Sequence, residues 1–578
     1  MDFSKFYHET KSKYAYAVDL NTLHIRLQTG KDDIFKVELI CFDPYVWVKD
    51  DSGEYKIANV QKISMVLEQS SNLHDFWFAE ISVPTKRCKY GFEVTGQDGE
   101  KSFYGVHGES CAGMEVEETS QLYYLFPYIL ESDLFSPPAW VKDTVWYQIF
   151  PERYANSELE DIKKGELLTW GSETTVDNSH LYGGDIPGIT ANLDDMHDLG
   201  ITGIYMTPIF SSPSTHKYDT EDYFTIDPVF GTNEHFGELV NEANKRGMRI
   251  MLDMVFNHIG YTNPIWLDVI EKGKSSKYFD WFCINEDGTY ETFATVKRMP
   301  KWKDSNPEAR EYLIGVAEYW VKNYKIDGIR LDVANEVSHD FWRAFRTRML
   351  AINPEIYILG EVWDNGMSWL LGDQFDAVMN YPLATAIWQY VSGETSGADF
   401  RSNMAKSLVM YPHDRQKVMF NLLGTHDTGR ILTLCNGIAE RVKQAFAVLL
   451  TSAGSPMILY GDEVGISGDN MDDTRKCMIW DKTKRNNDLR TFVQKLLTLR
   501  CEMPDMKSTF IEWLKTDDEG VIYKKGKIVI FLNGKDELVK FKLPTGIQGR
   551  LDLITGNPVA EQTHVTLDSY GVALWEVL

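Results

Sequence analysis

Polar side chains, most of them ionisable, gather where four apolar runs of this 578-residue chain end. The residues concerned are Asp253, Asn257 and His258 after MRIMLDMVF, Arg330 and Asp332 in GIRLDV, Glu361 in IYILGEVW, and His426 and Asp427 in VMFNLLGTHD. Two carboxyl groups about 5–5.5 Å apart can cleave a glycosidic bond with retention when one is protonated and the other is ionised. These residue types therefore indicate hydrolysis of a sugar linkage.

Asp332 and Glu361 end neighbouring runs and are the expected reacting pair, with Asp332 as nucleophile and Glu361 as general acid/base. Burial among other acids should keep Glu361 protonated at the start of the reaction. Arg330 lies two residues before Asp332 on the same strand face and should favour the ionised nucleophile.

Asp427 is the third expected catalytic carboxylate, because it could hydrogen-bond sugar hydroxyls as the transition state forms, with His258 and His426 beside it. A structural interpretation of any one of these acids is a helix cap, a loop carboxylate or a structural ion pair. Four strand ends in the required order favour the catalytic interpretation of the whole set.

The elements that must position these residues follow an alternating pattern. Eight apolar or β-branched runs, separated by long helical stretches, are VWYQIF, ITGIYMTP, MRIMLDMVF, GIRLDV, IYILGEVW, AVMNY, VMFNLLGTHD and MILYGDEV. This α/β pattern predicts a (β/α)₈ TIM barrel over residues 131–256 and 303–504. The excursion 257–302 after the third strand is too long for an ordinary loop and predicts an inserted B subdomain. In such a barrel, polar strand ends face the active-site mouth.

Short alternating strands flank the barrel. Residues 1–130 alternate apolar and polar positions, as in Leu23, Ile25 and Leu27, and predict an N-terminal β-sandwich. The two prolines of FSPPAW mark the end of this region. Residues 505–578 return to short strands and predict a C-terminal β-sandwich.

Composition narrows the class of ligand. The formal net charge of −26 disfavours nucleic acid and anionic membranes, which both require a positive field. Aromatic residues make up 13% of the chain and leave rings available for flat sugar faces. No signal peptide or apolar span is present, so we expect a cytoplasmic protein. The seven scattered cysteines predict reduced thiols rather than disulfides or a zinc site.

Four segments carry a resemblance to a known family. DMVFNH, GIRLDVANEV, GEVW and LLGTHD, in this order, resemble the signatures of the α-amylase family of glycoside hydrolases. VANE at 333–336, MPKW at 299–302 and an N-terminal sandwich similar to a starch-binding domain resemble the cyclomaltodextrinase, neopullulanase and maltogenic amylase branch.

This resemblance implies a retaining hydrolase of α-1,4 bonds in cyclomaltodextrins, maltooligosaccharides, pullulan and starch, with transglycosylation and without a required cofactor. It also implies a homodimer formed through the N-terminal domain, with a monomer as the alternative. An α-glucosidase or a sugar-rearranging relative on the same barrel stays open. A catalytically silent carbohydrate-binding barrel is a further alternative from a different class, because fold alone does not establish activity.

The resemblance also implies substrate contacts. His216 and Tyr218 in HKYDTEDYF would line the donor subsite, and Arg330, His258 and His426 are also expected to bind substrate. Asn335 and Glu336 of VANE would lie on the acceptor side, and the structural alternative is that both cap the following helix.

Phe256 and Trp363 could supply apolar surface for the sugar or belong to the core. Met471 stands where relatives commonly have Asp, and Arg475 together with Asp472 is expected to compensate for this change. A calcium loop of relatives is altered here, so a site built from Asn156, Glu158 and Asp185 competes with a metal-free acidic loop.

Overall fold

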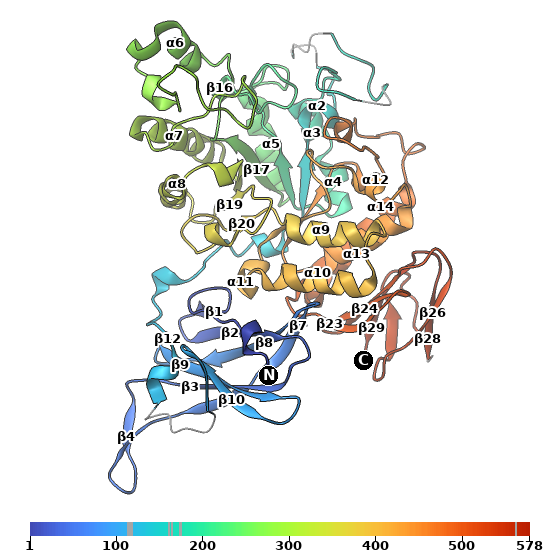
Figure 1. The fold of residues 1–578 in the computed structure, drawn as a ribbon. Coiled ribbons are helices and arrows are strands. Elements are labelled where there is room, and N and C mark those ends of the chain that lie inside the picture. The colour runs from blue at the N-terminus through green and yellow to red at the C-terminus, as the bar shows by residue number, and fades with distance from the viewer. Residues whose placement is uncertain (112–118, 160–161, 163–165, 173–175, 561–562) are drawn as a thin grey trace. The chain divides into compact units, whose positions relative to one another are not determined.

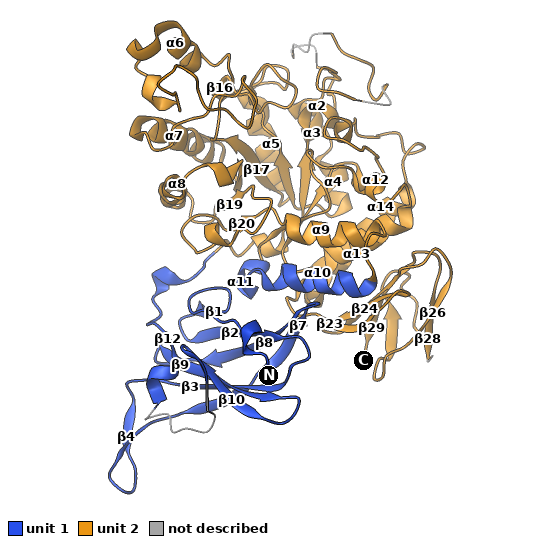
Figure 2. Cartoon of the chain, viewed as in Figure 1, with its two compact units in different colours: residues 1–136, 397–416 blue, residues 137–396, 417–578 orange. Residues whose placement is uncertain are grey.

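The computed structural model describes residues 1–111, 119–159, 162, 166–172, 176–560 and 563–578 (Figure 1). These residues form two compact units (Figure 2). The first unit comprises residues 1–136 and 397–416, and the second comprises 137–396 and 417–578.

Eight parallel strands form the barrel of the second unit. They are β13 (Trp146–Ile149), β14 (Gly203–Met206), β17 (Arg249–Val255), β18 (Gly328–Asp332), β19 (Tyr357–Gly360), β20 (Ala377–Val378), β21 (Phe420–Leu422) and β22 (Ser455–Leu459). Their order is β20-β19-β18-β17-β14-β13-β22-β21, and a parallel bridge between Met379 and Phe420 joins the two ends. All eight predicted runs contain a barrel strand, so the predicted (β/α)₈ fold class is confirmed.

Helices separate the barrel strands along the chain. They include α4 (Leu193–Leu199), α5 (Asn233–Lys245), α7 (Pro307–Tyr324), α8 (His339–Ile352), α9 (Tyr381–Val391), α13 (Ala439–Thr451) and α14 (Asn487–Glu502). Side chains at the N-caps fix where these helices begin: Thr232 accepts from the His235 amide, and Ser338 accepts from the Phe341 amide.

The register between barrel strands decides which predicted site residues become neighbours. Asp253 in β17 pairs with Arg330 in β18, and Val255 pairs with Asp332. The amide of Glu361, directly after β19, donates to the carbonyl of Leu331 in β18 at 2.9 Å. Parallel pairing therefore places the polar ends of three consecutive strands at one edge of the barrel.

Residues 257–302 contain α6 (Pro264–Lys272), two short 3₁₀ helices, η5 (Gly273–Ser275) and η6 (Phe279–Trp281), and isolated bridges rather than a continuous sheet. Aromatic packing holds this segment together. The rings of Phe282 and Trp302 stack at 4.6 Å, and Trp266 meets Phe282 edge-on at 4.7 Å. One isolated bridge joins His258 to Lys301, so both ends of the excursion return to the strand edge where it leaves the barrel.

The C-terminal region forms a five-stranded and a two-stranded antiparallel sheet. The larger sheet has the order β23 (Glu512–Thr516), β24 (Gly520–Lys525), β25 (Ile528–Asn533), β29 (Val572–Val577) and β27 (Gly549–Asp552). The smaller sheet pairs β26 (Val539–Lys542) with β28 (His564–Leu567). Phe531 and Trp575 of the larger sheet share one core with Phe541 and Val565 of the smaller one, as the predicted sandwich requires.

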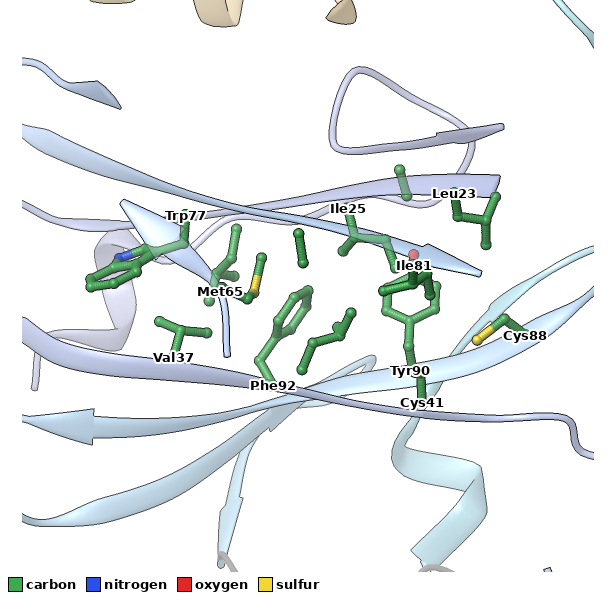
Figure 3. Packing of buried hydrophobic residues seen from close by; sticks show 14 of the residues in the cluster. Leu23, Ile25, Val37, Cys41, Met65, Trp77, Ile81, Cys88, Tyr90 and Phe92 are labelled. Atoms are coloured by element: carbon green, nitrogen blue, oxygen red, sulfur yellow. The ribbon is translucent and has the colours of Figure 1, made fainter. Parts of the chain in front are cut away.

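The N-terminal strands of the first unit form two sheets around one core. One sheet has the order β1 (Ala15–Asp19), β2 (Thr22–Gly30), β8 (His74–Ser82) and β7 (Val66–Ser70). The other has β11 (Gly108–Cys111), β10 (Lys101–Gly105), β9 (Cys88–Gly96), β3 (Ile34–Phe42) and β6 (Gln61–Ser64), with β12 (Tyr124–Phe126) paired to β9. Leu23 and Ile25 from the first sheet and Val37 and Phe92 from the second are fully buried between the sheets (Figure 3). The predicted N-terminal sandwich is confirmed.

Helices α10 (Gly397–Val409) and α11 (His413–Gln416) belong to the first unit, although they lie between β20 and β21 in sequence. The amide of His413 donates to the Tyr16 hydroxyl at 2.8 Å, and the His413 ring lies 2.9 Å from Glu68 of β7. The sequence analysis placed residues 397–416 within the predicted barrel, because they lie between two barrel strands in sequence. Contacts between residues far apart in the chain leave no local pattern that could have corrected this.

The described cysteine side chains are free thiols, and Cys111 lies outside the described side chains. Across the described ranges, no helix combines the length and apolar character that crossing a bilayer requires.

Candidate active site

A cavity of about 450 Å³ opens within the second unit. Its lining residues are Asn178, His216, Tyr218, His258, Phe293, Val296, Met299, Asp332, Val333, Asn335, Glu336, Glu361, Trp363, Asp427, Met471 and Arg475. The three predicted catalytic carboxylates and most of the predicted substrate contacts therefore face one space.

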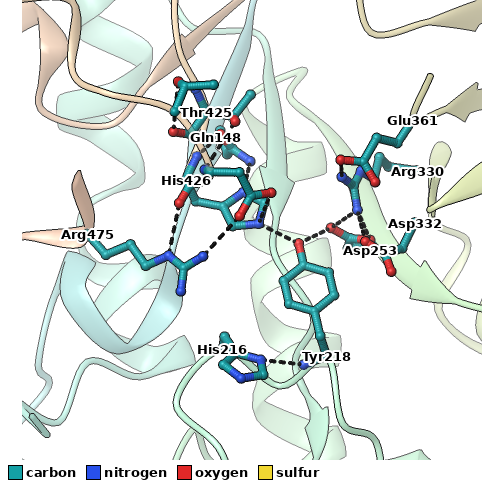
Figure 4. A network of polar contacts seen from close by, with 12 residues as sticks. Gln148, His216, Tyr218, Asp253, Arg330, Asp332, Glu361, Thr425, His426 and Arg475 are labelled. Atoms are coloured by element: carbon teal, nitrogen blue, oxygen red, sulfur yellow. Dashed lines mark hydrogen bonds and ion pairs between the residues drawn. The ribbon is translucent and has the colours of Figure 1, made fainter. Parts of the chain in front are cut away.

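One buried guanidinium connects the acids behind this cavity (Figure 4). Nη1 of Arg330 lies 2.9 Å from Asp332 Oδ1 and 2.9 Å from Asp253 Oδ1, and Nη2 lies 2.9 Å from Glu361 Oε1. We call Asp253, Arg330, Asp332 and Glu361 the acid cluster. If all of its carboxyl groups were ionised, three negative charges would surround one positive charge.

Asp253 has no access to solvent and was expected only as one of the polar strand ends. It accepts hydrogen bonds from the hydroxyls of Tyr205 at 2.7 Å and Tyr218 at 2.9 Å, in addition to Arg330. Burial raises its pKa to about 6 against the opposing charge of Arg330. Asp253 thus anchors both the arginine and a tyrosine that lines the cavity.

Burial also raises the pKa of Asp332 well above its usual range, and the nearby carboxylates add to this effect while Arg330 opposes it. The expected influence of Arg330 has the right sign, but it does not outweigh burial. Because these carboxyl groups lie around one guanidinium, their titration belongs to the acid cluster as a whole rather than to one residue.

Glu361 is held by two hydrogen-bond donors and one ion pair. Its Oε2 accepts the backbone N–H of Val333 at 2.9 Å, and its Oε1 accepts the indole N–H of Trp363 at 3.2 Å and lies 2.9 Å from Nη2 of Arg330. These contacts fix the orientation of the Glu361 carboxyl group beside Val333. The expected protonation of Glu361 during the reaction stays a prediction.

The Val333 amide reaches Glu361 through an unusual backbone conformation. Val333 has φ 47° and ψ 42°, the left-handed region that a β-branched residue rarely adopts. Such a conformation costs on the order of 1–3 kcal/mol and persists only where surrounding contacts impose it. The turn therefore stores strain directly after Asp332.

His426 is buried next to Tyr218 (Figure 4) and contacts Asp427. Its Nε2 lies 2.7 Å from the Tyr218 hydroxyl and 3.1 Å from Asp427 Oδ2, and the His426 and Tyr218 rings are parallel within 6°. Burial, with the charges of Arg475 and Arg330, holds the pKa of His426 well below its usual range. The imidazole is therefore neutral at neutral pH.

Arg475 fixes the other side of Asp427. Its Nη2 donates to Asp427 Oδ1 at 3.0 Å, its Nε donates to the carbonyl of His426 at 2.9 Å, and its Nη1 donates to Asn178 at 3.0 Å. Met471 lines the same cavity and is more than half exposed. Arg475 thus joins the Asp427 loop to the Asn178 loop.

Two further predicted histidines lie on the cavity wall. The His216 ring stacks on Tyr218 at 5.9 Å, and its Nδ1 accepts the Tyr218 amide at 3.1 Å. His258 stacks on Phe293 of the inserted segment at 5.0 Å. Burial lowers the pKa of both rings, to about 3 for His258, so both are neutral contacts near neutral pH.

Asn335 and Glu336 also face the cavity, in the 3₁₀ turn η7 (Ala334–Glu336). Glu336 forms an ion pair with Lys301 at 3.2 Å. The alternative role as caps of the next helix does not hold, because Ser338 caps α8.

The two aromatic residues considered for sugar contact, Trp363 and Phe256, lie in different environments. Trp363 is 46% exposed, lines the cavity and stacks on Tyr381 at 3.9 Å. Phe256 is buried and packs on Tyr223, Phe341 and Phe345 instead, so its predicted substrate contact is wrong. Its position one residue after β17 turns the side chain toward the helix layer.

The residues of the candidate calcium loop accept hydrogen bonds from backbone amides and a hydroxyl group of the protein. Asp185 caps α3 (Ile186–Ala191) through the Gly188 amide at 2.6 Å, and its other oxygen accepts the Ser157 hydroxyl at 2.7 Å. Asn156 accepts the Glu158 amide at 2.8 Å. Within the described ranges no group of three or more His, Cys, Asp or Glu could hold a metal ion. Because these oxygens of Asp185 and Asn156 already accept hydrogen bonds from protein groups, calcium and a metal-free acidic loop stay alternative predictions.

Several residues at the site escaped sequence reasoning. Gln148 contacts His426, while Asn178, Phe293 and Met299 line the cavity from loops far from the four signatures. Gln148 carried a usable signal, since it is the only polar residue in the first apolar run apart from a tyrosine hydroxyl. Met299 begins the MPKW segment that carries the branch resemblance, whereas Asn178 and Phe293 carried no such signal.

Comparison with known proteins identifies the family. The α-amylase catalytic-domain model matches residues 148–540, and the model of the N-terminal Ig-like domain of α-amylases matches residues 1–130. A cyclomaltodextrinase from Geobacillus thermopakistaniensis is 43% identical and covers 99% of this chain and 98% of its own length. An intracellular maltogenic amylase from Bacillus subtilis is 42% identical over 92% of each chain.

A solved cyclomaltodextrinase structure covers 100% of both chains with a TM-score of 0.91 at 37% identity. The two domain models cover the N-terminal sandwich and the barrel, and the full-length relatives and this structural likeness extend over the C-terminal sandwich as well. The chain therefore belongs to the α-amylase family of glycoside hydrolases, in its cyclomaltodextrinase and maltogenic amylase branch.

Proposed function

We propose that this protein is a retaining hydrolase of α-1,4 linkages in cyclomaltodextrins, maltooligosaccharides, pullulan and starch. The observation that carries the proposal is the single guanidinium of Arg330, which holds Asp332 and Glu361 at 2.9 Å each at the floor of one cavity. Two carboxyl groups held this way suit a double displacement on a sugar. The substrates named for the relatives support the choice of α-glucans.

In the first step, an oxygen of Asp332 attacks the anomeric carbon and the bond to the leaving oxygen breaks. Glu361 gives its proton to that oxygen, so the leaving sugar departs as an alcohol and a glycosyl ester remains on Asp332. Asp427, held by Arg475 and His426, accepts hydrogen bonds from sugar hydroxyls and tightens them as positive charge develops on the ring.

In the second step, Glu361 takes a proton from a water molecule, whose oxygen attacks the anomeric carbon and releases Asp332. A sugar hydroxyl in place of water gives transglycosylation. Asn335 and Glu336 line the cavity beside Val333 and supply polar contacts for such an acceptor. His216 and Tyr218 line it on the side of Asp427 and suit the donor sugar.

We also infer a cytoplasmic location and a homodimer formed through the N-terminal domain. An intracellular maltogenic amylase among the relatives supports the location. Light scattering of the purified protein, with and without residues 1–130, tests the dimer: a mass near twice 66.4 kDa only for the full chain is expected, and a full-length monomer contradicts it.

The function is tested by incubating the purified protein with β-cyclodextrin, pullulan and soluble starch and separating the products. Opening of β-cyclodextrin faster than starch degradation, with retained anomeric configuration, is expected. Asp332→Asn and Glu361→Gln should each lower kcat by about 10⁴-fold or more, because each removes one half of the reacting pair.

Three results would contradict the proposal. Inversion at the anomeric carbon would exclude Asp332 as nucleophile. Turnover of short maltosides alone would favour the α-glucosidase alternative. No turnover of any α-glucoside by a folded protein would favour the silent barrel. Thermal unfolding of both variants is the control, since neither should differ from the wild type by more than about 2 kcal/mol.

A further inference from the structure

We propose that Gln148 is a positioning residue that fixes His426 as the Nε2–H tautomer, so that this histidine donates toward Tyr218 and Asp427 at the cavity. The functional part of this inference rests on the proposed hydrolase activity. Gln148 lies in the barrel strand β13 and is fully buried. It makes two contacts with the same histidine, one to the backbone and one to the ring (Figure 4).

The backbone contact decides which way the Gln148 amide points. The N–H of His426 can only donate, and it donates to Gln148 Oε1 at 3.3 Å. The opposite amide orientation would place two donors against each other. Gln148 Nε2 is therefore the atom that lies 2.9 Å from His426 Nδ1.

The amide orientation then decides the tautomer of the ring. An amide NH₂ group only donates, so His426 Nδ1 must be the bare nitrogen that accepts. The ring is neutral at neutral pH, as shown above, and its single proton must be on Nε2.

The groups on the opposite side of the ring require the same proton. Asp427 Oδ2 lies 3.1 Å from Nε2, and a carboxylate only accepts. The Tyr218 hydroxyl lies 2.7 Å from Nε2 and 2.9 Å from Asp253 Oδ2, to which it donates its own proton. A chain of donors therefore runs from Gln148 through His426 and Tyr218 to Asp253.

The Gln148 amide is the contact that holds Nδ1 as an acceptor, so its loss would allow the proton to move to Nδ1 when the Tyr218 hydroxyl turns its own proton toward Nε2. A ring with its proton on Nδ1 would turn a lone pair toward Asp427 and would no longer hold it for the sugar. We therefore expect the resting geometry of Asp427, rather than the overall fold, to depend on Gln148.

The tautomer is measured directly on the resting wild-type protein by ¹⁵N NMR with labelled histidine at neutral pH. The His426 signals are assigned by their loss in His426→Gln. One protonated Nε2 and one bare, hydrogen-bonded Nδ1 are expected. A proton on Nδ1 in the wild type would overturn the proposal without any variant of Gln148.

The role of Gln148 is tested with Gln148→Met, which keeps the side-chain length and removes both polar atoms. We expect the two ¹⁵N shifts of His426 to move toward each other and kcat on β-cyclodextrin to fall roughly tenfold to a hundredfold, with KM changed much less. Wild-type shifts together with wild-type kcat would contradict the proposal.

Gln444→Met is the matched control. Gln444 is also buried, and its Nε2 donates to the carbonyls of Asn533 at 2.6 Å and Tyr570 at 3.0 Å, with no histidine in contact. The Gln444→Met variant should lose about as much unfolding free energy as Gln148→Met. It should keep the kcat and the His426 ¹⁵N shifts of the wild type. If the wild type cleaves no α-glucan, the proposed function fails, whereas the NMR result on the tautomer still stands.

Discussion

Each unit of the molecule buries a cluster of charged groups built around an arginine. In the N-terminal unit, Nε and Nη2 of Arg26 donate to the two oxygens of Glu68 at 2.7 and 2.8 Å, and His413 lies 2.9 Å from the same carboxylate. In the barrel, the acid cluster sets three carboxyl groups around Arg330. We call Arg26, Glu68 and His413 the N-terminal ion cluster.

The two clusters differ in charge balance. Burial alone would raise the pKa of Glu68, but Arg26 and His413 overcome it and hold this pKa at about 2. Burial prevails in the acid cluster, where the pKa of Asp253 is about 6 and that of Asp332 is also raised. A balanced cluster stabilises one charge state, whereas an acid-rich cluster can hold and release a proton near neutral pH.

The largest expected effect is the difference between substituting Arg330 and substituting Arg26. Arg330→Met should lower kcat on β-cyclodextrin by at least about 10³-fold and destabilise the fold, because it leaves three buried acids without a cation. Arg26→Met should cost about 3–5 kcal/mol of unfolding free energy and leave kcat of the folded protein unchanged. Urea unfolding and steady-state kinetics measure both quantities.

Loss of activity in folded Arg26→Met would show that the N-terminal ion cluster contributes to catalysis and would remove the contrast. Arg348→Met is a control for loss of a surface arginine. Arg348 is 41% exposed and pairs with Glu311, which is 63% exposed, and with Glu318, which is 15% exposed, so stability should change by less than about 1 kcal/mol.

Stability should respond to pH in opposite directions in the two clusters. The folded pKa of Glu68 lies below its ordinary value of 4.5, so Glu68 stabilises the protein above pH 4.5 and this contribution is lost as pH falls toward 2. The folded pKa of Asp253 lies above its ordinary value of 3.8, so its ionisation costs stability as pH rises from about 4 to 6.

Urea midpoints from pH 3.5 to 8 check these signs. Relative to the wild type, Glu68→Gln should be less stable at pH 7, and the deficit should shrink by about 1 kcal/mol per pH unit below 4.5. As the pH rises from 4 to 6, the unfolding free energy of Asp253→Asn should increase by about 3 kcal/mol relative to that of the wild type. If the unfolding free energies of Glu68→Gln and Asp253→Asn changed with pH in the same way, the contrast between the two clusters would be wrong.

A smaller effect concerns one tyrosine hydroxyl in each unit. Tyr218 donates to Asp253 and contacts His426, whereas Tyr16 contacts His24 at 3.0 Å and accepts the His413 amide. Tyr218→Phe should lower kcat about tenfold and Tyr16→Phe should not, although each loses about 1 kcal/mol of stability. Equal kcat values for the two variants would show that the Tyr218 hydroxyl is only structural.

The smallest expected effect tests the backbone strain at Val333, beside the acid cluster. None of Arg26, Glu68 and His413 has such a left-handed backbone conformation. Val333→Gly should stay within about 1 kcal/mol of the wild type, because relief of the left-handed backbone offsets the entropy of glycine. Val337→Gly, with φ −105°, should lose about 2 kcal/mol in thermal unfolding. An equal loss at both positions would show that Val333 is not strained.

Sequence reasoning succeeded wherever strand order alone fixes neighbours. The periodicity of the apolar runs predicted eight parallel strands, and their ends predicted that Asp332, Glu361 and Asp427 lie together, as the cavity shows. It went wrong for Phe256, because the turn after a strand decides which layer a side chain enters. The proposed roles of these residues await the experiments above.

The sequence by itself determined the architecture, since local patterns of burial repeat at intervals that only a barrel with flanking sandwiches satisfies. Only the tertiary structure decided the electrostatics. Whether a buried carboxyl behaves like Glu68 or like Asp253 depends on how many cations and acids reach it from distant segments. Burial, contact geometry and the left-handed turn at Val333 are properties of three-dimensional packing that no local pattern encodes.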